Sequence, residues 1–142
     1  MSQIERTLCI VKPDAISHNH GGQILAILEE AGLRPVALKR VRLSRQEAEG
    51  FYHVHRERPF FGSLIKFMSS GSVMMMVLEG ENAVARLRDL MGPTDPANAG
   101  EGMLRKRFGT NIERNAVHGS DSLASAMSEV AYFFSDLDLA RS

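Results

Sequence analysis

The chain has 142 residues, of which 44% are apolar, and this length suits one globular domain, residues 1–142, that buries its own core. Seventeen basic residues balance seventeen acidic ones, so bulk charge does not favour DNA or an anionic membrane as a partner. The single cysteine, Cys9, excludes an intramolecular disulfide, and the longest apolar run, Val73 to Leu78, is too short to cross a bilayer. Together with the lack of a signal-like N-terminal run, this predicts a cytoplasmic protein.

The first part of the chain predicts a strand, a helix and a second strand. Arg6 to Pro13 has the alternation of a strand, which the Pro13-Asp14 pair is expected to stop. After the Gly21-Gly22 pair, apolar residues at helical spacing predict a helix that ends at Gly32. Arg34 to Leu43 predicts the second strand.

The middle of the chain predicts two helices and a third strand. Ser44, with Glu47 three residues on, is a capping-box pattern that predicts a helix through about His55. After Pro59, apolar residues at helical spacing predict another helix that ends near Gly71. Ser72 to Gly80 predicts a buried strand, although its three consecutive methionines are unusual for one.

The last part of the chain contains an unusually long connection. Asn82 is expected to cap a helix whose apolar residues share one face. The 23 residues from Gly92 to Arg114 include two prolines and four glycines with little periodicity, which predicts a long functional loop. Asn115 to Ser120 predicts a short last strand, and Ser122 is expected to cap a final helix through about Phe134.

The order of these elements is a doubled βαβ arrangement with an inserted pair of helices. Its simplest packing is an α+β fold of the ferredoxin-like βαββαβ type, in which helices cover a four-stranded antiparallel sheet. A parallel doubly wound sheet is the alternative. It is disfavoured because four strands are few for that architecture and no glycine-rich phosphate turn follows the first strand.

The sequence lacks the motifs of P-loops, dinucleotide-binding folds, zinc proteases, hydrolase elbows and thiol-redox sites. It does contain cations and a hydroxyl on separate segments that could converge on a polyphosphate, because guanidinium and ammonium groups match phosphate oxygens. A single surface arginine or lysine is nevertheless usually only solvated. The candidates are Lys12, Arg86, Arg88, Thr94, Arg105, Lys106, Arg107 and Arg114.

His118 is the strongest single candidate for chemistry. It is placed where a strand should end, and its small neighbours Gly119 and Ser120 leave the ring accessible. A neutral imidazole held in one tautomer could attack phosphorus, and Glu129 on the last helix could hold it, with Ser120 as an intermediary. The alternative is an ordinary hydrogen-bonding histidine at a strand end.

Other histidines and aromatic residues are weaker candidates. His53 and His55 lie in the predicted helix, where i, i+2 spacing places two side chains on different faces, so a shared metal is disfavoured. His18 and His20 are expected to lie in a loop and to meet solvent. Of Phe60 and Phe61, one could stack on a base, although core packing of both is the simpler interpretation.

Taken in order and spacing, five blocks of the sequence resemble nucleoside diphosphate kinases. The resemblance runs from Glu5 to about Phe134, and the last block is among the most specific. The blocks are ERTLCIVKPD, FYHVHRERPFFGSLIKFMSSG, VLEGENAV, GPTDPANA and NAVHGSDS.

The resemblance implies transfer of a γ-phosphoryl group from a nucleoside triphosphate, mainly ATP, to nucleoside diphosphates of any base. It implies ping-pong kinetics through a phosphohistidine on His118, oriented by Glu129 and Ser120, and a role in maintaining nucleoside triphosphate pools. Magnesium is expected to bridge the β- and γ-phosphates, with no metal ligands from the protein. The implied nucleotide-binding residues are Lys12, Tyr52, Phe60, Arg88, Thr94, Arg105 and Asn115.

The resemblance also implies a homo-oligomer, with a tetramer favoured and a dimer or hexamer left open. The sequence departs from the family's usual residues at Ser72, Asp95, Met103 and the Lys106-Arg107 pair, none of which replaces an implied contact. A nucleotide-binding scaffold without activity and nucleic-acid binding through the basic loop are alternatives. Both are disfavoured, since the implied catalytic set is complete and the net charge is zero.

Overall fold

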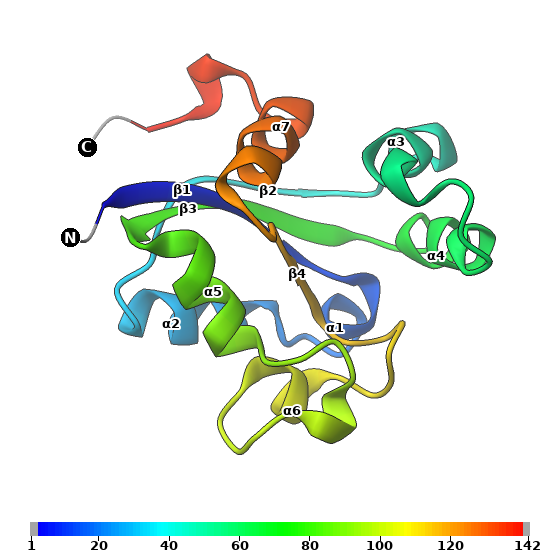
Figure 1. Ribbon diagram of the computed structural model, residues 1–142, viewed down its shortest axis with the longest axis horizontal. Coiled ribbons are helices and arrows are strands. Elements are labelled where there is room, and N and C mark those ends of the chain that lie inside the picture. Colours follow the sequence, from blue (N-terminus) through cyan, green and yellow to red (C-terminus); the bar gives the residue numbers. More distant parts are fainter. Residues whose placement is uncertain (1–2, 141–142) are drawn as a thin grey trace.

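The computed structural model describes residues 3–140 and contains a four-stranded antiparallel sheet with helices on both faces (Figure 1). The strands lie side by side in the order β2-β3-β1-β4, which confirms the ferredoxin-like expectation. Their bounds are β1 (Ile4–Val11), β2 (Arg34–Val41), β3 (Val73–Glu81) and β4 (Val117–Gly119).

The helices divide between the two faces of the sheet (Figure 1). One layer contains α1 (Pro13–Ser17), α2 (Gly21–Glu30), α5 (Ala83–Met91) and α6 (Leu104–Phe108). The other contains α3 (Arg45–Phe51), α4 (Phe61–Met68) and α7 (Leu123–Phe133). Residues 3–140 also contain three short 3₁₀ turns, η1 (His53–His55), η2 (Pro96–Asn98) and η3 (Asp136–Asp138).

Successive residues of the two central strands point into different cores. In β1, Leu8 packs in the core under α3, α4 and α7, whereas Cys9 packs in the core under α2 and α5. In β3, Met75 and Met76 divide in the same way, and both are fully buried. The run of methionines is therefore a strand with both faces buried, and each fully buried side chain contributes about 1.5–3 kcal/mol.

Local sequence signals correctly mark several helix ends. The Ser44 hydroxyl accepts from the Glu47 backbone N–H at 3.0 Å while the Glu47 carboxylate accepts from the Ser44 N–H at 2.8 Å, which forms the expected capping box. Ser122 caps α7 through the Ser125 N–H. Gly32 follows α2 with a φ of +89°, a conformation that favours glycine.

Four local predictions are wrong. The first strand spans Ile4–Val11, and Pro13 begins a short helix rather than a turn, because proline is well suited to the first helical position. The helix after Ser44 ends at Phe51, and residues His53–His55 form a 3₁₀ turn. Asn82 precedes α5 with a φ of +50° and makes no side-chain cap.

The connection from Gly92 to Arg114 is not a featureless loop, because it contains η2 and α6. The departures from the family pattern have local partners there: Asp95 caps η2 by accepting from the Ala97 N–H at 3.0 Å. Met103 places its sulfur 3.2 Å from the Gly100 nitrogen. Gly92, with a φ of +84°, lies so close to Met103 that an added Cβ would be 2.9 Å from that sulfur.

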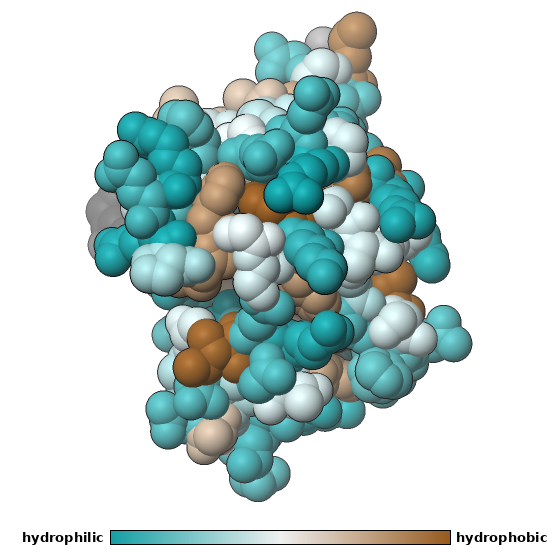
Figure 2. Space-filling view, turned by 90° about the vertical axis from the view of Figure 1, so that its right-hand side faces the viewer, coloured by the Kyte–Doolittle hydropathy of each residue, from teal (hydrophilic) through white to brown (hydrophobic). Residues whose placement is uncertain are grey.

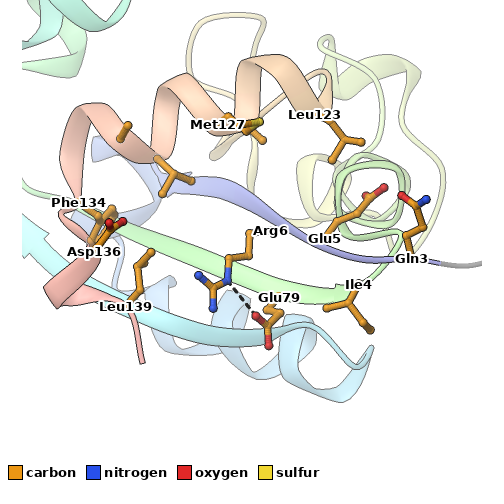
Figure 3. A pocket seen from close by; sticks show the side chains of 13 residues that line it. Gln3, Ile4, Glu5, Arg6, Glu79, Leu123, Met127, Phe134, Asp136 and Leu139 are labelled. Carbon is orange, nitrogen blue, oxygen red and sulfur yellow. Dashed lines mark hydrogen bonds and ion pairs between the residues drawn. The ribbon is translucent and has the colours of Figure 1, made fainter. Parts of the chain in front are cut away.

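A groove of about 570 Å³ lies between one end of the sheet and the side of α7 (Figure 3). Arg6 on β1 and Glu79 on β3 form an ion pair of 2.9 Å on its floor, and Leu123 and Met127 come from α7. The face that carries α3 and α4 is mostly hydrophilic, with scattered apolar side chains (Figure 2). Within residues 3–140, no helix is long and apolar enough to cross a membrane.

Candidate active site

A polar cleft of about 410 Å³ lies where the α3–η1 segment approaches β4 and α7. Six of the ten sequence-predicted site residues line it, namely Tyr52, Arg88, Thr94, Arg105, His118 and Glu129. Each comes from a different segment of the chain, so the fold brings together residues that are up to 77 positions apart, from Tyr52 to Glu129. The other four predicted residues lie behind or beside the cleft.

A strained turn places His118. The Val117 N–H donates to the Asn115 carbonyl at 2.9 Å, which forms a three-residue turn around Ala116 with a φ of +73°. The buried carboxylate of Asp14 accepts from the Ala116 N–H at 3.1 Å. The turn leads directly into β4, where His118 pairs with Ile10 of the central strand β1.

Glu129 contacts His118 directly, without Ser120 as the expected intermediary. His118 Nε2 lies 2.8 Å from Glu129 Oε1, and Ser120 Oγ donates to the same oxygen at 2.9 Å. Ser120 is fully buried, and its hydroxyl accepts from the Leu8 N–H at 3.2 Å. The three groups form a chain of hydrogen bonds from the core strand to the imidazole.

This hydrogen bond assigns the two ring nitrogens of His118. A carboxylate only accepts, so Nε2 carries the proton that it donates to Glu129. Nδ1 of the neutral ring is then left with its lone pair. The arrangement can present one defined nitrogen nucleophile, with a negative charge placed at the other side of the ring.

Lys12 and Asn115 are buried beside the cleft rather than in its lining. Lys12 Nζ donates to the Asn115 side-chain oxygen at 2.9 Å and to the Glu113 carbonyl at 2.8 Å. The Asn115 amide donates to the Thr94 carbonyl at 3.0 Å, which links the pair to the cleft. Burial lowers the pKa of Lys12 to about 8, and the nearby Asp14 carboxylate offsets part of this decrease by raising the pKa.

The two arginines of the cleft differ in how many of their N–H donors remain available to an anion. Arg105 is buried and donates to the Gly92 carbonyl at 3.0 Å and to the Val117 carbonyl at 2.9 Å. Burial and the adjacent Arg88 lower the pKa of Arg105 to about 10. Arg88 is exposed and makes only a long contact of 3.4 Å to the Gly119 carbonyl, so its guanidinium is open to an anion.

Two predicted aromatic residues occupy different positions. Tyr52 is buried, with its ring 6.1 Å from that of His118 and nearly perpendicular to it. Burial and the Glu129 carboxylate raise the pKa of Tyr52, so its hydroxyl stays protonated. Phe60 is 49% exposed and lies outside the cleft lining, whereas Phe61 packs against the core. One aromatic residue is thus free to stack and the other is not.

The sequence interpretation missed several residues that line the cleft. His55 lies between Tyr52 and Phe60, with ring centroids 6.5 and 5.6 Å away, and a one-turn 3₁₀ segment brings it there. Asp121 accepts from the Ser125 hydroxyl at 2.6 Å, and this bond, helped by Arg88, lowers the pKa of Asp121. The i, i+4 spacing of Asp121 and Ser125, on either side of the helix cap Ser122, could have indicated this hydrogen bond.

Sequence and structure comparisons agree on one family. The sequence model of the nucleoside diphosphate kinase family matches residues 5–139. The chain is 61% identical over 136 residues to a nucleoside diphosphate kinase of Rhodospirillum centenum, covering 96% of this chain and 97% of that protein. It is 57% identical to one of Anaeromyxobacter dehalogenans, covering 96% and 92% of the two chains.

Two solved structures have the same fold. The nucleoside diphosphate kinase of Aquifex aeolicus superposes with a TM-score of 0.96 at 46% identity, over 97% of this chain and 100% of that chain. A halophilic nucleoside diphosphate kinase from Halobacterium salinarum, in complex with CDP, superposes with a TM-score of 0.95 at 37% identity, over 99% and 93% of the two chains. The likeness extends over nearly the whole chain in each case.

Proposed function

Because the chain belongs to the nucleoside diphosphate kinase family, we propose that His118 is the residue that carries the phosphoryl group between nucleotides. The enzyme transfers the γ-phosphoryl group of a nucleoside triphosphate to a nucleoside diphosphate. The observation that supports His118 is its 2.8 Å contact with Glu129 in a cleft that also contains Arg88 and Arg105. A nucleophile, an orienting carboxylate and phosphate-binding cations then occupy one site.

The first half-reaction forms a nitrogen–phosphorus bond. The lone pair of His118 Nδ1 attacks the γ-phosphorus, and the bond from phosphorus to the bridging oxygen breaks, so the nucleoside diphosphate leaves with that electron pair. The ring gains positive charge while Nε2 keeps its proton, and the Glu129 carboxylate stabilises that charge. The second half-reaction is the reverse, with a different diphosphate as acceptor.

The cations of the site would hold the phosphates in line with the histidine. Arg88 has the freest guanidinium, while Lys12 and Arg105 are pre-positioned by backbone carbonyls that fix their direction. Bound together with the nucleotide, Mg²⁺ would neutralise phosphate charge that these cations leave. We propose that it arrives with the nucleotide rather than in a site built by the protein, since residues 3–140 contain no group of three or more His, Cys, Asp or Glu side chains that could hold a metal ion.

Recognition of the nucleoside would come from contacts that do not read the base. The exposed ring of Phe60 can stack on any nucleobase, because each has a π-face. Asn115 and Lys12 would contact the ribose, and Thr94 the phosphates. Broad base specificity follows, and the family resemblance implies ATP as the main donor.

We further propose a cytoplasmic homo-oligomer, with a tetramer favoured. The apolar Leu38 on the edge strand β2 is 47% exposed, which supports contact between copies. We treat residues 1–142 as one nucleoside diphosphate kinase domain, although residues 1–2 and 141–142 lie outside the described range. Light scattering of the purified protein would measure the assembly.

Labelling with ATP carrying a radioactive γ-phosphate tests the proposed nucleophile. We expect label that is stable in alkali and labile in acid, on His118 and absent from His118→Ala. The alanine variant should bind ADP with nearly unchanged affinity while transfer is abolished. Turnover retained by folded His118→Ala would refute the assignment, and His55→Ala, which alters another histidine of the cleft, is the matched control.

A further inference from the structure

Phe51, the last residue of α3, touches the proposed nucleophile. It lines the cleft, and its ring centroid lies 5.3 Å from that of His118 with the planes at 74°. This edge-to-face arrangement is the preferred geometry for two aromatic rings. The proposed reaction assigns no role to Phe51. The distance between ring centroids is nevertheless shorter from Phe51 to His118 than from Tyr52 to His118.

The contact adds a second restraint to the one that Glu129 supplies. The hydrogen bond to Glu129 holds Nε2, but a single hydrogen bond still allows the imidazole to tilt about the bonds that join it to the backbone. A half turn about the Cβ–Cγ bond would replace Nδ1 by a carbon at the position that faces phosphorus and would also break the hydrogen bond to Glu129. An aromatic ring packed edge-to-face on the imidazole opposes that turn.

Phe51 is itself held by the helix that carries Glu129. Its ring centroid is 4.8 Å from Phe133 and 5.9 Å from Tyr132, both on α7. The Tyr132 hydroxyl donates to the Glu47 carbonyl of α3 at 2.8 Å, which ties the two helices together. One helix therefore supplies both the hydrogen-bond acceptor for the imidazole and the support for the ring that packs on it.

We propose that Phe51 is a positioning residue for phosphoryl transfer, which keeps the His118 imidazole turned so that Nδ1 faces the reacting phosphorus. This inference rests on the proposed phosphohistidine. It predicts that loss of the ring lowers the rate of histidine phosphorylation, because Nδ1 then faces the reacting phosphorus for less of the time. Affinity for the nucleotide should change little, since Phe51 acts through His118 rather than on the substrate.

Phe61 is the matched control for Phe51. Both are partly buried phenylalanines packed against the same core, but Phe61 does not line the cleft and, within residues 3–140, has no ring contact with Phe51 or His118. Replacing either by alanine should destabilise the protein to a similar extent. Only the Phe51 change removes a ring in contact with His118.

The test compares Phe51→Ala, Phe51→Leu and Phe61→Ala with the unmodified protein. Rapid quench with labelled ATP measures the phosphorylation rate, and steady-state kinetics measure KM. We expect both Phe51 variants to phosphorylate about tenfold more slowly, in line with a lost aromatic contact, with KM within about twofold. Phe61→Ala should keep the phosphorylation rate within about twofold of the unmodified protein.

The outcomes separate this inference from the function on which it rests. If the unmodified protein forms no phosphohistidine, the proposed function fails. If the unmodified protein is labelled but the Phe51 variants match Phe61→Ala in phosphorylation rate, the positioning role is overturned. If Phe51→Ala does not fold, Phe51→Leu decides, because leucine keeps most of the packing volume without a flat ring.

Discussion

Replacing Glu129 by glutamine tests whether its negative charge drives phosphorylation of His118. The side chains of His118 and Glu129 are only 22% and 20% exposed, so water screens their interaction incompletely. A charge-assisted hydrogen bond of this kind contributes about 1.5–3 kcal/mol, and two unit charges about 4 Å apart near a protein surface interact by about 4 kcal/mol. We therefore expect a loss of about 2–3 kcal/mol of transition-state stabilisation.

This loss corresponds to a fall of about 30-fold to 150-fold in the phosphorylation rate constant. Rapid quench with labelled ATP is the suitable assay, because the chain has no tryptophan to report the reaction by fluorescence. Ser128→Ala is the control, since Ser128 lines the same cleft on the same helix but its hydroxyl donates only to backbone carbonyls of α7, and it should change the rate by less than about twofold. A Glu129→Gln rate within about threefold of the unmodified enzyme would refute charge stabilisation by this carboxylate.

Three further predictions follow from other parts of the site. Since burial lowers the pKa of Lys12 to about 8, its ammonium loses its proton above that pH, and ADP affinity measured by calorimetry should weaken about tenfold from pH 7 to pH 9. Lys12→Gln should bind weakly and equally at both pH values, and a flat curve for the unmodified protein would contradict the lowered pKa. Phe60→Ala should raise KM about tenfold with kcat within about twofold, and a fall in kcat alone would contradict stacking on the base. Gly119→Ala should lower the free energy of unfolding in urea by about 1–3 kcal/mol, because the new Cβ would lie 2.7 Å from the Met91 sulfur. Gly62 has open space around it, so Gly62→Ala should change that free energy by less than about 1 kcal/mol. Equal effects of the two substitutions would refute the clash.

The elements that could be predicted from the sequence are those with many residues in one pattern. The strand containing Met75 was predictable because a run of apolar residues between glycines suits a strand buried on both faces. The short helix from Pro13 was not, since five residues give no measurable periodicity and its stability comes from burial. The same reason explains α6, which lies inside the segment that the sequence assigned to a loop.

The candidate site likewise has some features that could be predicted from the sequence and others that could not. Six of the ten residues that the resemblance implies line one cleft, but no sequence pattern indicates that Arg105 donates to the carbonyls of Gly92 and Val117. The contact between Phe51 and His118 could not be predicted from the sequence either, because it depends on how α3 ends beside β4. Both are tertiary contacts between distant segments, and no local pattern in the sequence indicates them.

The register between β1 and β4 determines on which face of the sheet the His118 side chain lies. His118 pairs with Ile10, which faces the core under α3 and α7, so the imidazole lies on the same face as Phe51 and Glu129. A slip of one residue would turn His118 toward the opposite core, because side chains alternate along a strand. Ser120 opposes such a slip, since its N–H donates to the Leu8 carbonyl while its hydroxyl accepts from the Leu8 N–H, both at 3.2 Å. Ser120→Ala should therefore affect the site through strand register as well as through Glu129, and hydrogen exchange at the Leu8 amide would measure the first effect separately from the second.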